Sequence, residues 1–270
     1  MNAVEKLAAK NSVNKFICVG LDTDIEKIPR HLLTSKNPAL EFNRAIITAT
    51  YKHAAAYKVN FAFYEKDGVN GFKLLSDTLT LIPPDLPVIA DVKRGDIGNT
   101  SGMYAKSVFD HFKFDAATLN PLMGKDSLQP FLNYKDKLNF ILALTSNPGA
   151  DDFEKLELND GSFLYQKIIE KVNEWNDNNN CGIVFGATNS SELNENIKMF
   201  DRLAILLPGV GAQGGSLPDV VNAFKKENRK NYLINVSRGI IYKSNGNDFA
   251  EQAEYELMRM NKQVQLIIDS

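Results

Sequence analysis

The sequence contains few cysteines and histidines, and its acidic and basic residues nearly balance. Each of these features argues against a class of protein. Two cysteines, Cys18 and Cys181, cannot build a disulfide-rich secreted domain, and we expect both to be small hydrophobic core residues. The three histidines lack the spacing of metal ligands, so no metal site is predicted. The formal net charge of −2 argues against nucleic acid or an acidic membrane surface as a partner.

Long apolar runs are also missing. No stretch approaches the roughly 18 apolar residues of a transmembrane helix, and the first residues carry no apolar segment typical of a signal peptide. These absences favour a cytoplasmic enzyme or binding protein with no membrane partner.

What the sequence does contain is ordinary globular composition, with 44% hydrophobic and 24% charged residues in a chain of 270. Short apolar runs rich in β-formers alternate with segments long enough for a helix, which predicts a parallel sheet with right-handed crossovers. Eight such units in this length predict an α/β fold, a (β/α)8 barrel. The runs are Phe16–Leu21, Ala56–Phe61, Pro87–Asp91, Ala116–Asn120, Asn139–Leu144, Gly182–Gly186, Leu203–Leu207 and Tyr232–Val236.

Helices are predicted between these runs, and a single domain is predicted over residues 1–270 because no linker or low-complexity segment interrupts the alternation. The alternative fold, an open doubly wound sheet, lacks a G-x-G-x-x-G motif after its first strand. The predicted helices are Ala39–Tyr51, Gly71–Leu81, Ser101–Phe112, Ser162–Asn176, Ser190–Met199, Leu217–Asn228 and Ala250–Lys262.

The strongest chemical signal follows the third run, where residues 91–100 read D-V-K-R-G-D-I-G-N-T. Side chains two apart on a strand share a face, so Asp91 and Lys93 point the same way at the strand end. Gly95 lets the chain turn and brings a second carboxylate, Asp96. A lysine between two acids holds them ionised, and such coupled groups mark chemistry more often than structure. A surface ion-pair network on a loop is the alternative interpretation.

A phosphate site is predicted after the seventh and eighth runs, where barrels of this type often hold phosphate. Residues 208–216 read P-G-V-G-A-Q-G-G-S, and the glycines expose backbone N–H groups to an anion. Arg238 can bind phosphate with two hydrogen bonds, and Gly239 lets backbone amides assist. Two ordinary turns with a surface arginine are the alternative.

Three other strand ends offer polar groups. Asp22 can accept hydrogen bonds from a pair of ribose hydroxyls, or can simply belong to a turn. Lys58 lies in an apolar run where an unpaired ammonium is costly, so it should meet Asp91 or Asp96 inside the barrel mouth unless it faces outward. Ser146 can read the amide edge of a heterocycle, or can lie in a simple turn.

Taken together, these motifs resemble the orotidine 5′-phosphate decarboxylase family, in the form whose third-strand motif reads D-x-K-R-G-D-I-G-x-T. Residues 91–100 match that motif without departure, and the similarity extends from G-L-D at 20–22 to S-R-G at 237–239. The resemblance implies a (β/α)8 lyase that converts orotidine 5′-monophosphate into UMP and CO2 without metal or organic cofactor. That reaction is the last step of de novo pyrimidine nucleotide synthesis.

The resemblance also implies roles for the charged residues. Lys58, Asp91, Lys93 and Asp96 match an alternating lysine–aspartate array. Within it, Lys93 matches the proton donor to C6 of the pyrimidine, and Asp91 the residue beside the substrate carboxylate. Lys58 would hold Asp91 and bind the ribose.

Substrate-binding roles are implied by the same comparison. Asp22 matches the ligand of the ribose hydroxyls, and Ser146 the reader of the pyrimidine. The phosphate side contains Gln213, which matches the side chain linking phosphate to base, together with Gly215, Arg238 and Gly239.

Asp96 and Thr100 match residues that reach the site of a neighbouring subunit, so the resemblance implies a homodimer. Arg94 has no implied contact with substrate, and we expect it in a structural ion pair or a dimer contact.

Three alternative functions stay open at this point. A 3-keto-L-gulonate-6-phosphate decarboxylase shares D-x-K-x-x-D and the phosphate loops but uses Mg²⁺; the R-G-D-I-G-x-T extension and Ser146 argue against it, and sensitivity to a chelator would separate the two. A Schiff-base aldolase would need Lys58 or Lys93 unprotonated, which flanking carboxylates disfavour. Trapping with borohydride in the presence of substrate would reveal such an enzyme.

A non-catalytic phosphonucleotide-binding protein would bind UMP without turnover, and the intact charged array argues against that interpretation.

Overall fold

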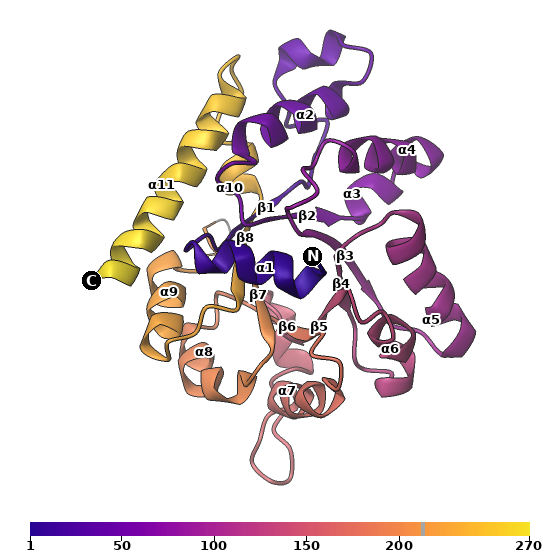
Figure 1. The fold of residues 1–270 in the computed structure, drawn as a ribbon, viewed down its shortest axis with the longest axis vertical. Coiled ribbons are helices and arrows are strands. Elements are labelled where there is room, and N and C mark those ends of the chain that lie inside the picture. Colours follow the sequence, from indigo (N-terminus) through magenta and orange to yellow (C-terminus); the bar gives the residue numbers. More distant parts are fainter. Residues whose placement is uncertain (212–213) are drawn as a thin grey trace.

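The computed structural model describes residues 1–211 and 214–270, and its centre is a closed barrel of eight parallel strands in sequence order (Figure 1). Each predicted run overlaps one of these strands, so the predicted (β/α)8 architecture is confirmed. The strands are β1 Ile17–Gly20, β2 Ala56–Asn60, β3 Val88–Arg94, β4 Ala116–Leu119, β5 Leu138–Leu144, β6 Cys181–Phe185, β7 Ala204–Pro208 and β8 Tyr232–Val236.

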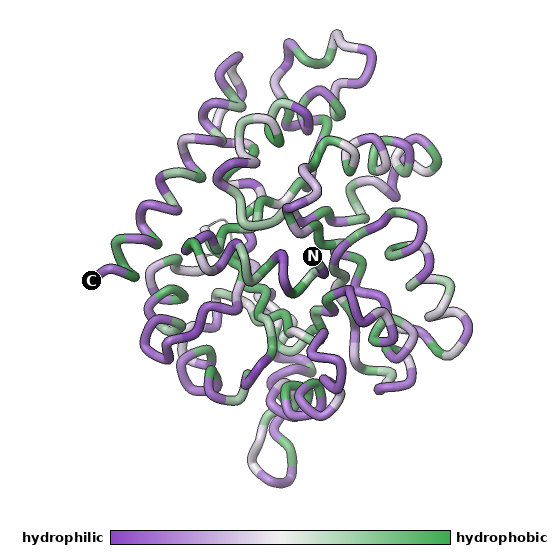
Figure 2. Tube along the Cα trace, viewed as in Figure 1, coloured by the Kyte–Doolittle hydropathy of each residue, from purple (hydrophilic) through white to green (hydrophobic). Residues whose placement is uncertain are grey.

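The strands are buried on both faces, which explains why they read as continuous apolar runs. One face of each strand fills the barrel interior, where Cys18, Phe140 and Leu206 belong to a single cluster. The other face packs against the helices, and the hydrophobic colour in Figure 2 concentrates on the central strands accordingly. Cys18 and Cys181 are both buried free thiols, as predicted, and burial raises the pKa of each to about 12.

The helices surround the barrel (Figure 1), and each of the seven predicted helical segments overlaps one of them. The sequence analysis missed α1, α6 and the two short helices α3 and α10. Helix α6 includes Pro130, a residue that usually breaks a helix. The α-helices are α1 Ala3–Ser12, α2 Pro38–Thr50, α3 Ala62–Glu65, α4 Gly68–Leu79, α5 Gly98–Ala105, α6 Lys125–Leu132, α7 Leu164–Trp175, α8 Ser190–Asn196, α9 Leu217–Lys226, α10 Arg238–Ile241 and α11 Phe249–Asp269. The short 3-10 helices are η1 Arg30–Thr34, η3 Pro148–Asp152 and η4 Ile197–Phe200, and η2 Lys106–His111 is a π-helix that continues α5.

Helix α1 closes the end of the barrel where the strands begin. Its Leu7 packs on the interior cluster, and Lys6 and Lys10 form ion pairs with Asp115 and Asp85 in the loops that precede β4 and β3. The interior is therefore accessible from the opposite end, where the strands finish. Over the part of the chain that the structure describes, no helix combines the length and the apolar character needed to cross a bilayer.

Candidate active site

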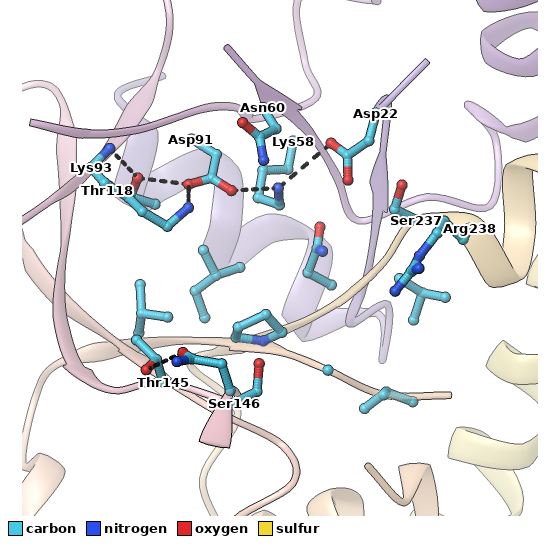
Figure 3. Close-up of a pocket in the computed structure, with 18 of the residues that line it drawn as sticks. Asp22, Lys58, Asn60, Asp91, Lys93, Thr118, Thr145, Ser146, Ser237 and Arg238 are labelled. Carbon is cyan, nitrogen blue, oxygen red and sulfur yellow. Dashed lines mark hydrogen bonds and ion pairs between the residues drawn. The ribbon is translucent and has the colours of Figure 1, made fainter. Parts of the chain in front are cut away.

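A cavity of about 290 Å³ opens at the carboxyl ends of the strands (Figure 3). Its lining combines charged and polar side chains with an apolar floor supplied by the barrel interior. The charged and polar members include Asp22, Lys58, Asn60, Asp91, Lys93, Thr118, Thr145, Ser146, Asn147, Asn235, Ser237 and Arg238, and the floor includes Leu142, Val184 and Leu206.

Four charged groups of alternating sign run across this cavity. Asp91 lies in the middle: its Oδ1 is 2.6 Å from Lys93 Nζ and its Oδ2 is 2.8 Å from Lys58 Nζ. Lys58 Nζ also lies 3.9 Å from Oδ1 of Asp22, beyond the end of β1. The order Lys93–Asp91–Lys58–Asp22 is visible in Figure 3 as one connected row. Lys58 was predicted to meet Asp91 or Asp96 in the mouth, and the structure shows that its partner is Asp91.

Asp91 and Lys58 form an ion pair whose two side chains are almost wholly buried, so each charge strongly affects the pKa of the other group. Burial alone would raise the pKa of the Asp91 carboxyl, but the charges of Lys58 and Lys93 hold that pKa well below its usual range. Burial alone would lower the pKa of Lys58, but Asp91 and Asp22 hold it above its ordinary value. Asp91 and Lys58 are therefore both charged around neutral pH.

Strand β3 is irregular where it supplies these groups. Its register against β4 shifts between Ala90 and Arg94, and Lys93 adopts a φ of +46°, in the left-handed region. A non-glycine residue held there costs about 1–3 kcal/mol and persists only where its surroundings enforce it. The side chain of Lys93 nevertheless remains half exposed, so it can meet a ligand in the cavity.

The opposite side of the cavity, which Figure 3 shows with Ser237 and Arg238, is basic because of the Arg238 guanidinium, and we call it the basic wall. Arg238 and Gly239 lie at the start of α10, next to Gly209 and Val210 from the loop after β7. The Arg238 guanidinium makes no hydrogen bond or ion pair with any residue that the structure describes, so it is available to an anion. Gly209 has a φ of +103°, which a residue with a side chain rarely adopts.

The turn after β5 brings Ser146 to the cavity. Its neighbour Thr145 is fixed by Glu154, whose carboxylate accepts a hydrogen bond from the Thr145 N–H at 2.6 Å and one from the hydroxyl at 3.0 Å. Burial raises the pKa of Glu154, although these two hydrogen bonds act in the opposite direction. The turn is thus held by local contacts before any ligand binds.

Asp22 is held by a similar set of contacts. The Tyr242 hydroxyl donates to the backbone oxygen of Asp22 at 3.0 Å and accepts from the N–H of Asp24 at 2.6 Å. The buried Asn43 accepts from Thr23 beside it, which ties this segment to α2. The Asp22 carboxylate therefore has a fixed position opposite Lys58.

Some of the predicted site residues do not line the cavity of this single chain. Asp96 accepts a hydrogen bond from the next N–H along the chain, at Ile97, and Thr100 is exposed on α5. Gly215 pairs with Gly209 inside its own loop. Gln213 lies outside the described residues.

Arg94 points away from the cavity. Its guanidinium forms an ion pair with Glu65 at 2.6 Å and lies over the ring of Tyr104. The expected structural ion pair is present.

The cavity residues that the sequence analysis missed include Asn60, Thr118 and Asn235. Asn60 lies two residues after Lys58 and so shares its face of β2, which was a usable signal. Asn235 is a lone polar residue within a buried strand, and its Oδ1 has no hydrogen-bond partner among the described residues. Burying such a group is costly, so its presence in an apolar run also indicated a site.

A (β/α)8 barrel with an alternating lysine–aspartate row and a basic wall at its strand ends defines a barrel enzyme for an anionic substrate. The sequence agrees with a family model over residues 15–253. The chain belongs to the orotidine 5'-phosphate decarboxylase / HUMPS family.

Individual relatives agree over nearly the full length. Orotidine 5'-phosphate decarboxylase of Christiangramia forsetii is 48% identical over 263 residues, which cover 96% of this chain and 95% of that protein. The structure of Leishmania donovani OMP decarboxylase is 33% identical, with a TM-score of 0.85 and 100% of both chains covered. Leishmania donovani UMP synthase is 35% identical with a TM-score of 0.86; the match covers 97% of this chain and 56% of that longer one.

Proposed function

We propose that this enzyme decarboxylates orotidine 5′-monophosphate to UMP and CO2, with Lys93 as the proton donor to C6. One observation carries the mechanism: the Asp91 carboxylate lies between two ammonium groups, Lys93 at 2.6 Å and Lys58 at 2.8 Å. Relatives named orotidine 5'-phosphate decarboxylase, at 45–48% identity and over nearly the full chain, support the same reaction.

The proposed chemistry follows from these charges. The bond between C6 and the carboxylate breaks, the electron pair stays on C6, and CO2 leaves. The ammonium of Lys93 stabilises the developing negative charge and then gives C6 its proton. The ionised Asp91 repels the substrate carboxylate, and this repulsion is relieved as CO2 forms. Each step uses only groups of the protein, so the proposal needs no metal or organic cofactor.

The remaining predicted residues are assigned to substrate binding. Arg238 and Gly239 would bind the phosphate together with Gln213 and Gly215 of the loop after β7. Asp22 and Lys58 would bind the ribose hydroxyls, and Ser146 would bind the pyrimidine. Binding energy from the phosphate end can then be used at the reacting carbon.

We also propose a homodimer in which Asp96 and Thr100 enter the partner's cavity. The exposed apolar side chains near these residues support it, because single chains rarely leave so many uncovered in one region. They lie on the loop after β3, on α5 and on the loop after β4: Ile97, Met103, Tyr104, Leu122 and Met123. We also propose a cytoplasmic location, which is consistent with an enzyme of nucleotide synthesis.

The testing experiment follows the orotate absorbance during incubation with orotidine 5′-monophosphate, with and without EDTA. We expect loss of absorbance at the same rate in both, with UMP as product. Turnover abolished by EDTA would contradict the cofactor-free mechanism. Binding of UMP without turnover would instead indicate a binding protein, or a sibling activity on a phosphosugar with Mg²⁺.

A further inference from the structure

The hydroxyl of Thr118, in β4, contacts three groups of β3 at once. Its oxygen accepts hydrogen bonds from the backbone N–H of Val92 and from that of Lys93, both at 3.0 Å. It also lies 3.0 Å from Oδ1 of Asp91 and donates to it. Thr118 is 2% exposed, so water does not compete for these bonds.

The direction of these bonds is fixed by the chemistry of a hydroxyl, which has one proton and two lone pairs. Both backbone groups are donors and take the two lone pairs. The single proton therefore faces an acceptor, and the ionised carboxylate of Asp91 is that acceptor. The hydroxyl of Thr118 therefore uses its proton and both lone pairs in hydrogen bonds to β3.

The strand pairing explains why a side chain is needed here. Ala90 pairs with Ala117 and Arg94 pairs with Leu119, so three residues of β3 face the single residue Thr118 of β4. The extra N–H groups in this bulge cannot use the regular ladder, and buried backbone donors need partners. The left-handed φ of Lys93 falls inside the same bulge.

We propose that Thr118 is a positioning residue for the decarboxylation: it fixes the bulge in β3 so that Asp91 and Lys93 both face the cavity, and it holds Asp91 between its two lysines. This inference rests on the proposed function for its kinetic consequence. Its structural part, protection of two backbone amides by one hydroxyl, stands independently of the reaction.

The test compares T118V and T118A, which remove the hydroxyl with two different volumes, with T118S, which keeps it. We expect T118V and T118A to lower kcat by about ten- to hundredfold, the effect of one lost hydrogen bond to a charged group. Affinity for UMP should change less than about threefold, since Thr118 acts through Asp91 and Lys93. T118S should keep kcat near the wild-type value. T80V, the same change at an exposed hydroxyl that donates to Asp77, serves as the control.

Two further readouts separate positioning from general stability. Hydrogen exchange followed by NMR should be slow at the amides of Val92 and Lys93 in the wild type and in T118S, and fast in T118V. The pKa of the Asp91 carboxyl, followed directly by NMR of that carboxylate, should be higher in T118V than in the wild type, because a carboxylate that loses a donor has a higher pKa.

The outcomes are distinguishable. If the wild type is active but T118V has unchanged kcat and unchanged amide exchange, the positioning role of Thr118 is wrong. The proposed reaction would still stand in that case. T118S as impaired as T118V overturns the positioning role too. A wild type without turnover overturns the proposed function, and amide exchange then decides whether Thr118 holds the bulge.

Discussion

Lys93 and Lys58 flank the same carboxylate but differ in exposure. The Lys93 side chain is 50% exposed and that of Lys58 is 5% exposed. An exposed ammonium can approach a ligand and can recover a proton from water after each turnover. The buried Lys58 is suited to holding Asp91 in place, because its charge is fixed by its two acidic neighbours.

Replacing Lys93 with alanine should abolish measurable turnover and leave UMP bound. The variant lacks the proposed proton donor and its positive charge, whereas the proposed phosphate side of the cavity is unchanged. Steady-state kinetics and calorimetric titration with UMP measure the two effects. The control is Lys262→Ala, an exposed lysine on α11. Near-normal turnover of Lys93→Ala would exclude Lys93 as the donor.

Replacing Arg238 with alanine should weaken UMP binding by about ten- to hundredfold, the cost of one charge-assisted contact. Affinity for uridine, which has no phosphate, should stay the same. Titration of both ligands into Arg238→Ala, and into Arg202→Ala as a control outside the cavity, gives the comparison. Equal loss for uridine and UMP would show that Arg238 does not act through the phosphate.

Most of the charged cavity could be predicted from the sequence, since parallel strands of one barrel bring their carboxyl ends together. Asp22, Lys58 and Asp91 are far apart in sequence, yet Asp22 closely follows β1 and the two others lie within β2 and β3. Thr118 could not be found this way, because its role depends on a bulge in a neighbouring strand. The hydrophobic pattern favours one register, but a local bulge of this kind depends on the two strands together and cannot be inferred from either sequence alone.

Among the elements, the turn after β5 is packed against the end of β6 at Gly186. A Cβ placed on Gly186 would lie 2.8 Å from the backbone N of Ser146 and 2.9 Å from the carbonyl carbon of Thr145. Backbone atoms cannot move aside as a flexible side chain can. Glycine at this position therefore sets how closely Ser146 approaches the cavity.

Gly186→Ala should displace this turn and lower kcat/KM by about tenfold or more, because small misplacements of binding groups are costly. Overpacking should also destabilise the fold by about 1–3 kcal/mol. Steady-state kinetics and thermal unfolding measure the two effects. Wild-type kcat/KM in a folded variant would mean that the position of Ser146 is not critical.

The strands were predictable because burial on both faces leaves continuous apolar runs, but four helices, α1, α3, α6 and α10, were not predicted. In α6 the proline lies inside the helix, and tertiary contacts override the local signal. The end of β3 extends to Arg94, beyond the apolar part of its run, because charged residues continue the strand into the cavity.

For the whole molecule, the proposed dimer predicts complementation between two inactive variants. Lys93→Ala and Asp96→Ala damage the same cavity from different subunits, so a mixed dimer has one cavity with both defects and one intact cavity. Random mixing should restore about a quarter of wild-type activity. Kinetics of the unfractionated co-expressed mixture measures this, and the mixed dimer isolated through two affinity tags, with one intact cavity of its two, should show about half of wild-type activity.

Recovery should be absent when both substitutions lie in the same chain and that chain is mixed with itself. No recovery from the mixed dimer would mean that Asp96 does not serve the partner's cavity. A monomer in analytical ultracentrifugation would contradict the homodimer itself.

The pairing of β1 with β8 has a consequence for biosynthesis. Ile17 of β1 lies beside Ile234 of β8 in the closed barrel. During synthesis, β1 therefore lacks this hydrogen-bonding partner until some 200 further residues have been translated. Until then, the nascent sheet has two open edges, and open edges invite pairing with other chains. Helix α11, which packs against α2 and α9, follows later still. The ribosome must therefore release almost the entire polypeptide before the catalytic mouth can assemble, and chaperone protection is most needed in that interval.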